Sequence, residues 1–216
     1  VIVDWPAGMR MQCYVFSAAF MVKEFLADQM YQIDPDFRPT KGQTVVDVGG
    51  HQGFFTALAA SLVGPTGRVL TVEAFSDNFR VLKRNIEFNA LSQVTLVEVA
   101  ASDVSGEATF HVFREVTGGS LVLKPDGAGT VTVAQQRLDF ILDQANIREV
   151  DLIKIDVEGA CLKVLRGASL TLLSKPKLVM EVEGGETEVA KVRTHLEGLG
   201  YKIRRDGAIL YARAHR

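Results

Sequence analysis

The sequence predicts a doubly wound α/β domain built on a mostly parallel, seven-stranded sheet with an antiparallel terminal strand. From Thr44 onward, short β-branched apolar runs alternate with segments whose apolar residues have helical spacing. The runs are apolar at nearly every position, as expected when helices cover both faces of a parallel sheet. The chain of 216 residues is long enough to bury a sizeable core in one Rossmann-like domain.

Each expected element follows from a local pattern. Residues 44–50, TVVDVGG, indicate a strand that ends in glycines, and residues 54–63 have the apolar spacing of a helix. A second strand is expected over 67–74, before a helix over 76–90 that Ser76 or Asp77 caps. The remaining predicted elements are strands at 94–101, 150–157 and 177–183, a helix at 189–199 that Gly200 ends, and an antiparallel hairpin over 201–213 that turns at Asp206 and Gly207.

Two segments interrupt this alternation within a single predicted domain, residues 1–216. Residues 1–40 are expected to form an N-terminal helical cover, because residues 9–30 are apolar at helical spacing. Residues 106–136 contain alternating stretches punctuated by glycines and a proline, which indicates inserted edge strands and a loop able to cap a site.

Composition restricts the classes of partner. With 24 basic and 26 acidic residues the net charge is −2, so we expect neither nucleic acid nor a membrane as partner. The two cysteines, Cys13 and Cys161, lack the spacing of a metal or redox motif. The sequence contains neither a signal-peptide pattern nor a membrane-spanning apolar stretch, so a soluble, cytoplasmic protein is the default expectation.

The stretch DVGGHQG, residues 47–53, lies where the first strand turns into the first helix, and Glu73 ends the second strand. Ligands of doubly wound sheets bind at this edge. A nicotinamide dinucleotide site would also use glycines and an acid here, but its fingerprint is GxGxxG. The spacing in this chain is DxGxxxG, which favours S-adenosylmethionine, a ligand without a pyrophosphate.

In this interpretation Asp47 orders the loop and helps to receive the methionine end of the cofactor. Gly49 and Gly50 present their backbone at close range, and Glu73 binds the ribose hydroxyls. His51 either contacts the ligand or only forms hydrogen bonds within the loop.

Two longer stretches, DVGGHQGFFTALAASLVGPTGRVLTVEAFSDNFRVLKRNIEFNAL and KIDVEGACLKVLRGA, resemble the FkbM-type methyltransferases, and the likeness runs over residues 29–183. The Leu138–Asp139 pair also has a counterpart in that family, which usually has Ala and Asn at the positions of Gly50 and His51. The resemblance implies a class I methyltransferase that uses S-adenosylmethionine, and it places Ser102 and Asp103 near the adenine. Together, the loop and the resemblance predict cofactor contacts at Asp47, Gly49, Gly50, His51, Gly53, Glu73, Ala74, Ser102 and Asp103.

The predicted catalytic residues are Asp156 and Glu158, which follow the fourth buried strand and face the same edge. Either carboxylate could remove a proton from the acceptor, bind an acceptor amine or hydroxyl, or face the sulfonium. Glu158 could instead cap the helix that follows it. Glu181 and Glu183 are expected to line the acceptor pocket or to lie as solvated strand-end charges.

Carboxylates around Asp156 could hold a divalent ion, but no histidine or further acid has a spacing that requires one, so we expect no metal. The leading hypothesis is O-methylation of a hydroxyl on a small molecule, such as a sugar or natural product, an acceptor class that the resemblance implies. Alternatives are an RNA or protein methyltransferase, a non-catalytic cofactor-binding module and a nicotinamide-dependent dehydrogenase. The slight excess of acidic over basic residues and the absence of an NPPY-like motif at a strand end argue against an RNA methyltransferase.

Overall fold

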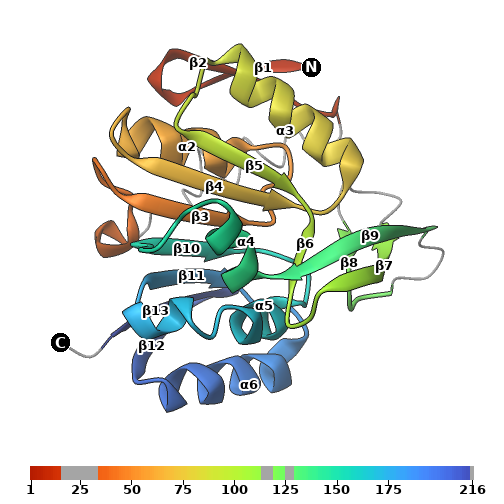
Figure 1. Cartoon of the computed structure of the whole chain (residues 1–216), viewed down its shortest axis with the longest axis vertical. Helices are drawn as coiled ribbons and strands as arrows, with labels where there is room; N and C mark the ends of the chain where they lie inside the picture. The colour runs from red at the N-terminus through yellow and green to blue at the C-terminus, as the bar shows by residue number, and fades with distance from the viewer. Residues whose placement is uncertain (16–33, 113–118, 125–128, 215–216) are drawn as a thin grey trace.

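The computed structural model describes residues 1–15, 34–112, 119–124 and 129–214. A seven-stranded sheet in the order β12-β13-β11-β10-β3-β4-β5 runs through the centre (Figure 1). Strand β13 is antiparallel to both β11 and β12, whereas β11, β10, β3, β4 and β5 are parallel, so the predicted fold class is confirmed. The strands are β3 (Thr44–Val48), β4 (Arg68–Glu73), β5 (Val94–Glu98), β10 (Leu152–Ile155), β11 (Lys177–Glu181), β12 (Tyr201–Asp206) and β13 (Ile209–Ala214).

Helices cover both faces of this sheet, and successive strand residues enter two different cores. In β10, for example, Ile153 and Ile155 join the core beneath three helices, while Leu152 joins the opposite one. The first core packs under α4 (Leu138–Gln144), α5 (Cys161–Gly167) and α6 (Gly185–Gly198), and the second under α2 (Phe54–Val63). The side-chain period of two along a strand explains this division, and the burial of both faces explains the continuous apolar runs.

The N-terminal segment differs from the prediction. Residues Met9–Gln12 form strand β2, which pairs antiparallel with β1 (Ile2–Trp5), rather than the start of a helix. Met9 and Met11 are buried and the two polar residues between and after them are exposed, which is the alternation of a strand. Most of the predicted helix over 9–30 lies outside the described residues.

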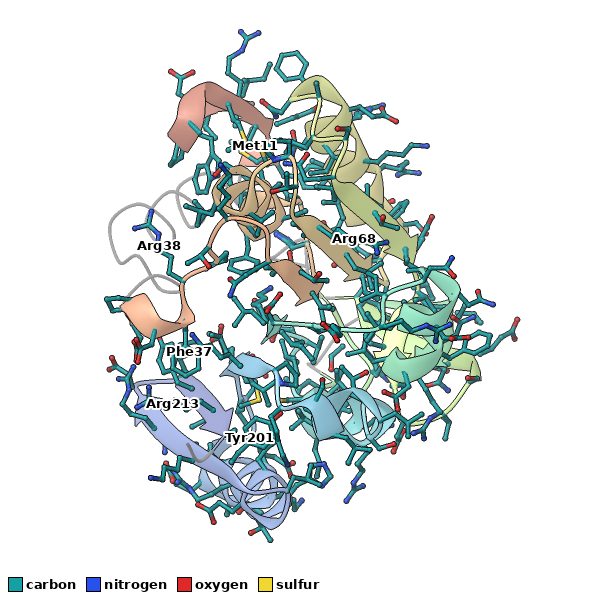
Figure 2. All side chains as sticks on the ribbon, turned by 60° about the vertical axis from the view of Figure 1, so that its left-hand side comes forward. Met11, Phe37, Arg38, Arg68, Tyr201 and Arg213 are labelled. Atoms are coloured by element: carbon teal, nitrogen blue, oxygen red, sulfur yellow. The ribbon has the colours of Figure 1, made fainter. Side chains whose placement is uncertain are left out.

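Several contacts attach the N-terminal region to the domain, among them the following two. Figure 2 shows Met11 close to helix α3 (Ser76–Phe88), where Asn89 at the end of that helix donates a hydrogen bond to the Met11 sulfur, 3.7 Å away. Phe37, in the short helix η3 (Pro35–Phe37), packs edge-on against Tyr211 with 5.1 Å between ring centroids. These contacts hold the segment against the face that α2 covers.

Residues 106–136 contribute strands to a second sheet. Strands β6 (Ala100–Ser102), β7 (Gly106–Val112), β8 (Gly119–Ser120) and β9 (Gly129–Arg137) pair in the order β6-β9-β7-β8 and extend to one side of the main sheet (Figure 1). The predicted strand over 94–101 is therefore divided between two sheets, because β5 ends at Glu98 and β6 pairs with β9. The predicted caps Ser76 and Asp77 are also wrong, since Phe75 is the N-cap of α3 and no side chain caps it.

Among the described residues, no helix is long and apolar enough to span a membrane.

Candidate active site

After β3 ends, the glycine loop bends toward the neighbouring strand β4. The amides of Gly49 and Gly50 both donate hydrogen bonds to the carbonyl oxygen of Val72, at 2.9 and 3.1 Å. The amide of His51 then donates to Oε2 of Glu73, 2.8 Å away. The loop is therefore fixed to β4 by its own backbone, at the carboxyl edge of the sheet.

Glycine is required at Gly49 and Gly53 for two reasons. Both have positive φ angles, +82° and +89°, which residues with a side chain rarely adopt. A Cβ atom at Gly49 would lie 1.7 Å from the carbonyl oxygen of Asp156, and one at Gly53 would lie 2.5 Å from Cδ1 of Leu82. The loop thus touches the end of β10 with its backbone, which brings the two predicted sites into contact.

Glu73 is nearly buried at the end of β4, and each of its carboxylate oxygens accepts a backbone hydrogen bond. Oε2 accepts from His51 and Oε1 accepts from Phe75, both at 2.8 Å. Burial raises the pKa of Glu73 to about 7, although these two hydrogen bonds act in the opposite direction. A carboxylate with two oxygens has about four acceptor positions, so Glu73 retains the capacity to accept hydrogen bonds from a ribose diol.

Asp47 and Lys154 form a buried ion pair beneath the loop. They are cross-strand neighbours on β3 and β10, and Nζ of Lys154 lies 3.2 Å from Oδ1 of Asp47. The Thr56 hydroxyl, from α2, donates to Oδ2 of Asp47 at 2.7 Å. Burial raises the pKa of Asp47, while Lys154 and Thr56 lower it. Asp47 is fully buried, and these contacts support the part of the prediction in which it orders the loop; its contact with the methionine end remains a prediction.

Lys154 is the residue that the sequence interpretation missed. Its Nζ also donates to the carbonyl oxygen of Gly49 at 2.8 Å and lies 3.5 Å from Oδ2 of Asp156. One buried cation therefore contacts both the glycine loop and Asp156, which follows β10. A single lysine within the apolar strand LIKI was the available signal, because a lysine is almost never fully buried unless it is paired.

Three carboxylates converge at the edge beside β10. Oxygens of Asp156, Glu181 and Glu183 all lie within 4.8 Å of one another, a separation at which three carboxylates could also hold a divalent ion. Burial raises the pKa of Glu183, and the nearby charge of Asp156 raises it further. A carboxyl group in this environment holds a proton more readily than an ordinary glutamate, so Glu183 is a stronger base than an exposed carboxylate.

Glu158 lies in the turn after β10 and is not part of this group of three. It does not cap α5, because the N-cap of that helix is Ala160 and no side chain caps it. Instead, Oε2 of Glu183 accepts a hydrogen bond from the amide of Gly159, at 2.7 Å. The alternative in which Glu158 is only a helix cap is therefore wrong.

His51 and Ala74 flank Glu73. His51 has a positive φ of 50°, and its ring nitrogen Nε2 lies 3.4 Å from Nε2 of Gln52. This is a contact within the loop, and a ligand contact of the ring remains a prediction. Ala74 packs against the small core that contains Phe110 of the second sheet. Both residues thus lie beside the predicted ribose site.

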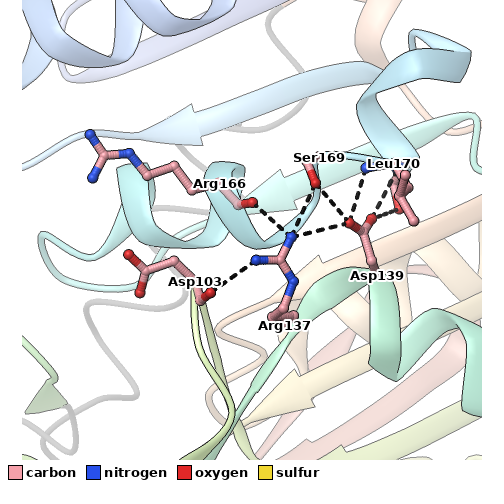
Figure 3. A network of polar contacts seen from close by, with 7 residues as sticks. Asp103, Arg137, Asp139, Arg166, Ser169 and Leu170 are labelled. Carbon is pink, nitrogen blue, oxygen red and sulfur yellow. Dashed lines mark hydrogen bonds and ion pairs between the residues drawn. The ribbon is translucent and has the colours of Figure 1, made fainter.

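Ser102 and Asp103 are held at a junction on the side of α5, and their contact with the adenine remains a prediction. A Cβ atom at Gly167 would lie 1.9 Å from the Ser102 carbonyl oxygen, so β6 packs directly on the end of α5. Figure 3 shows Arg137 donating to the carbonyl oxygens of Asp103 and Arg166, at 3.0 and 3.3 Å. The residue that adjoins Glu73 is Val99, whose amide donates to the Glu73 carbonyl oxygen at 3.1 Å. The cause is the early end of β5, after which the chain turns away to pair with β9.

The charges at this edge favour a cationic ligand. Asp156, Glu181 and Glu183 surround the strand end, and the buried Lys154 is already paired with Asp47 and Asp156. Carboxylates attract a sulfonium and repel a pyrophosphate. The donor set therefore fits S-adenosylmethionine, with Glu73 for its ribose and the acidic group for its positive charge. Fold and site together fit a class I methyltransferase that uses S-adenosylmethionine.

Comparison with known families narrows this class. The sequence model described as the methyltransferase FkbM domain matches residues 47–203, and the chain belongs to that family. The match includes the glycine loop, Glu73 and the IDVEG turn, so the resemblance to FkbM-type methyltransferases is confirmed.

Two relatives extend over most of the chain. Methyltransferase 1 of Beauveria bassiana is 26% identical over 207 residues, which cover 85% of this chain and 81% of that protein. Methyltransferase sdnD of Sordaria araneosa is 27% identical over 237 residues, which cover 92% of this chain and 89% of that protein.

Solved structures share the fold at low sequence identity. The FkbM methyltransferase from Methylobacillus flagellatus has a TM-score of 0.59 at 17% identity, with 93% of this chain covered and 55% of that one. The chain thus spans about half the length of that protein. Fibrillarin from Aeropyrum pernix, solved with bound S-adenosyl-L-methionine, has a TM-score of 0.53 at 15% identity and covers 98% of this chain and 92% of its own.

Proposed function

We propose that this chain transfers the methyl group of S-adenosylmethionine to a hydroxyl oxygen of a small molecule. The observation that carries the proposal is the close group of Asp156, Glu181 and Glu183 at the carboxyl edge, with the raised pKa of Glu183. A hydroxyl is a weak nucleophile until a base removes its proton, whereas an unprotonated amine is nucleophilic without that step. A carboxylate with a raised affinity for protons therefore suits an oxygen acceptor.

The cofactor, when bound, supplies an electrophilic methyl group on a sulfonium. In our proposal Glu73 binds the ribose hydroxyls, and the backbone of Gly49 and Gly50 lies against the methionine part. Asp156 and Glu183 act together as the base that receives the hydroxyl proton, and Glu158 orients the acceptor. The site then contributes mainly by holding the reactants close and in line, for which effective molarities are on the order of 10⁵ M or more.

The net charge of −2 and the acidic edge support a small acceptor over RNA, because carboxylates repel a phosphate backbone. FkbM membership supports the methyl transfer itself. The same acidic edge disfavours a protein acceptor less strongly, so a protein is included as a control substrate below.

The first test of the proposal is calorimetric titration with S-adenosylmethionine, S-adenosylhomocysteine and NAD in parallel. We expect the first two to bind and NAD not to bind; binding of NAD alone, or of none of them, would overturn the proposal. The second test incubates the chain with methyl-labelled S-adenosylmethionine and a panel of sugars, phenols and aliphatic alcohols, with amines, bulk RNA and a denatured protein as controls. Methyl ethers identified by mass spectrometry support the proposal, and label found only in the amines, RNA or protein contradicts it.

A further inference from the structure

Ser120 connects the second sheet to the catalytic turn. It lies in β8, is fully buried, and its hydroxyl donates to the carbonyl oxygen of Glu158 at 2.5 Å. The hydroxyl oxygen of Ser120 in turn accepts hydrogen bonds from the amides of Val122 and Leu123, at 2.9 and 2.8 Å. A serine hydroxyl has one hydrogen to donate and two lone pairs, so all its positions are used. Ser120 is thus held firmly while it holds Glu158.

The backbone that Ser120 contacts is in an unusual conformation. Glu158 has a φ of +50° and Gly159 a φ of +87°, both in the left-handed region. This conformation is unfavourable for residues other than glycine. A residue such as Glu158 keeps it only where the surrounding structure holds the backbone in place. Two hydrogen bonds do so here: Ser120 binds the carbonyl oxygen of Glu158, and Glu183 binds the amide of Gly159.

Packing adds to the contact between the segment over 119–123 and the turn. A Cβ atom at Gly159 would lie 3.1 Å from Cγ of Leu123, so the Leu123 side chain rests against the glycine backbone. Gly119 has no space for a side chain, because a Cβ atom there would lie 2.3 Å from Cε1 of Phe110. The chain is therefore confined on both sides of Ser120.

The same sheet also contacts the other end of the site. Phe110, in β7, stacks on Phe75 with 6.2 Å between ring centroids, and Phe75 follows Glu73 by two residues. One continuous sheet thus contacts the strand end of the predicted ribose site through Phe110 and the catalytic turn through Ser120.

We infer that Ser120 is a positioning residue for the acceptor: by holding the Glu158 backbone in the left-handed conformation, it sets the direction of the Glu158 side chain. The inference rests on the proposed function, in which Glu158 orients the acceptor. A structural role alone would lower stability and leave the kinetics of the folded protein unchanged. A positioning role lowers kcat of the folded protein and requires Glu158 for its effect.

The test compares Ser120→Ala with Ser61→Ala. Ser61 is a matched control, because its hydroxyl also donates to a backbone carbonyl, that of Leu58 at 2.7 Å, within α2. Ser120→Cys is a conservative variant that retains a weak donor of similar shape and keeps the test possible if the alanine variant does not fold. The first readout, hydrogen exchange of the Gly159 amide, needs no acceptor.

We expect Ser120→Ala to speed exchange of the Gly159 amide by about three- to tenfold, the effect of losing one neutral hydrogen bond, and Ser61→Ala to leave it unchanged. Ser120→Cys should be intermediate. Exchange in the folded Ser120→Ala variant that equals wild type would overturn the inference.

The second readout is methyl transfer to whichever alcohol of the panel the wild type methylates. We expect Ser120→Ala to lower kcat by about tenfold or more with the Kd for S-adenosylhomocysteine within about twofold of wild type. Added to Glu158→Gln, it should cause no further loss, since both changes remove the same interaction. Fully additive losses would contradict action through Glu158. If the wild type binds no S-adenosylhomocysteine, the proposed function fails. If the wild type binds it normally, and Ser120→Ala changes neither the exchange of the Gly159 amide nor kcat, only the positioning role is overturned.

Discussion

Lys154 joins the two strand ends of the site, because its Nζ donates to the carbonyl oxygen of Gly49 at 2.8 Å while facing Asp156 at 3.5 Å. Gly49 follows β3 and Asp156 follows β10, so one ammonium fixes the glycine loop relative to the predicted base. The lysine side chain is 4% exposed, which means that its charge is stabilised by these partners and by Asp47 instead of by water. Lys154 thereby couples the positions of the predicted cofactor and acceptor sites.

Replacing Lys154 by methionine should destabilise the fold strongly. The change leaves Asp47 buried without its cation, and breaking a buried ion pair costs about 3–5 kcal/mol. Urea unfolding checks this expectation. The double variant Lys154→Met with Asp47→Asn should lose less than the sum of the single changes, because no charge is left unpaired. Lys191→Met, at an exposed pair with Glu188, is the control and should cost less than about 1 kcal/mol.

Gly49→Ala should disrupt the site more than its backbone angle alone predicts. The new Cβ would collide with the Asp156 carbonyl oxygen at 1.7 Å, in addition to the unfavourable positive φ. Gly207→Ala is a matched control, since Gly207 also has a positive φ, +57°, with nothing within 4 Å of the added atom. We expect the control to cost about 1–2 kcal/mol and Gly49→Ala at least about 2 kcal/mol more. Equal unfolding midpoints in urea would contradict the collision.

Elements with a strong local pattern could be predicted from the sequence, as α2 shows. Its bounds, Phe54–Val63, match the predicted helix, because glycine precedes it and the apolar spacing is regular. The segment Met9–Gln12 was misjudged because its apolar residues satisfy both a strand and a helical pattern over so short a length. Pairing with β1, a tertiary contact, decided between the two.

Within the site, sequence position identified the residues that lie directly at strand ends, such as Glu73. It could not show that the Glu73 carboxylate is occupied by the amides of His51 and Phe75, since hydrogen bonds of this kind depend on loop conformation. Lys154 was missed because its role comes from cross-strand register with Asp47. Register in a parallel sheet joins residues far apart in sequence, and spacing along the chain does not reveal it.

Glu73 should make both stability and ligand binding depend on pH near neutrality. Its pKa is raised to about 7 in the folded chain from an ordinary value of 4.5, so between these pH values the folded chain binds more protons than the unfolded one. Stability contributed by this group is therefore present below 4.5 and lost as the pH rises to about 7. Relative to Glu73→Gln, the free energy of unfolding of wild type should fall by on the order of 3 kcal/mol across this window, as urea unfolding measures.

Binding should show the opposite trend, because the ionised carboxylate is the better acceptor for ribose hydroxyls. Calorimetry with S-adenosylhomocysteine should show affinity rising with pH through about 7 in wild type. Glu73→Gln should bind at least about tenfold more weakly at pH above that value and lose the pH dependence. Unchanged affinity in this variant would remove Glu73 from the cofactor site.

Asp139→Ala should destabilise the junction shown in Figure 3 without weakening the cofactor site. The Asp139 carboxylate accepts hydrogen bonds from the amides of Leu170 and Thr171, both at 2.9 Å, and the alanine variant leaves these donors without it. We expect a loss of about 2–3 kcal/mol, against less than about 1 kcal/mol for Asp143→Ala, an exposed pair in the same helix. S-adenosylhomocysteine should bind both folded variants equally, and selective loss in Asp139→Ala would support the prediction that the Ser102–Asp103 segment contacts adenine.

Asp156→Asn and Glu158→Gln should separate catalysis from cofactor binding. If Asp156 receives the acceptor proton, its amide variant loses general-base catalysis, a contribution of about 10²- to 10⁴-fold in kcat. Glu158→Gln keeps the shape of the side chain but removes its charge, so we expect a smaller loss in kcat together with a higher KM for the acceptor. The Kd for S-adenosylhomocysteine should stay within about threefold of wild type in both variants, since Glu73 and the glycine loop are intact.

Glu149→Gln, at an exposed position, serves as the control for a lost surface charge. Full activity in both active-site variants would show that the base lies elsewhere, whereas loss of S-adenosylhomocysteine binding in Asp156→Asn would reassign this residue to the cofactor site.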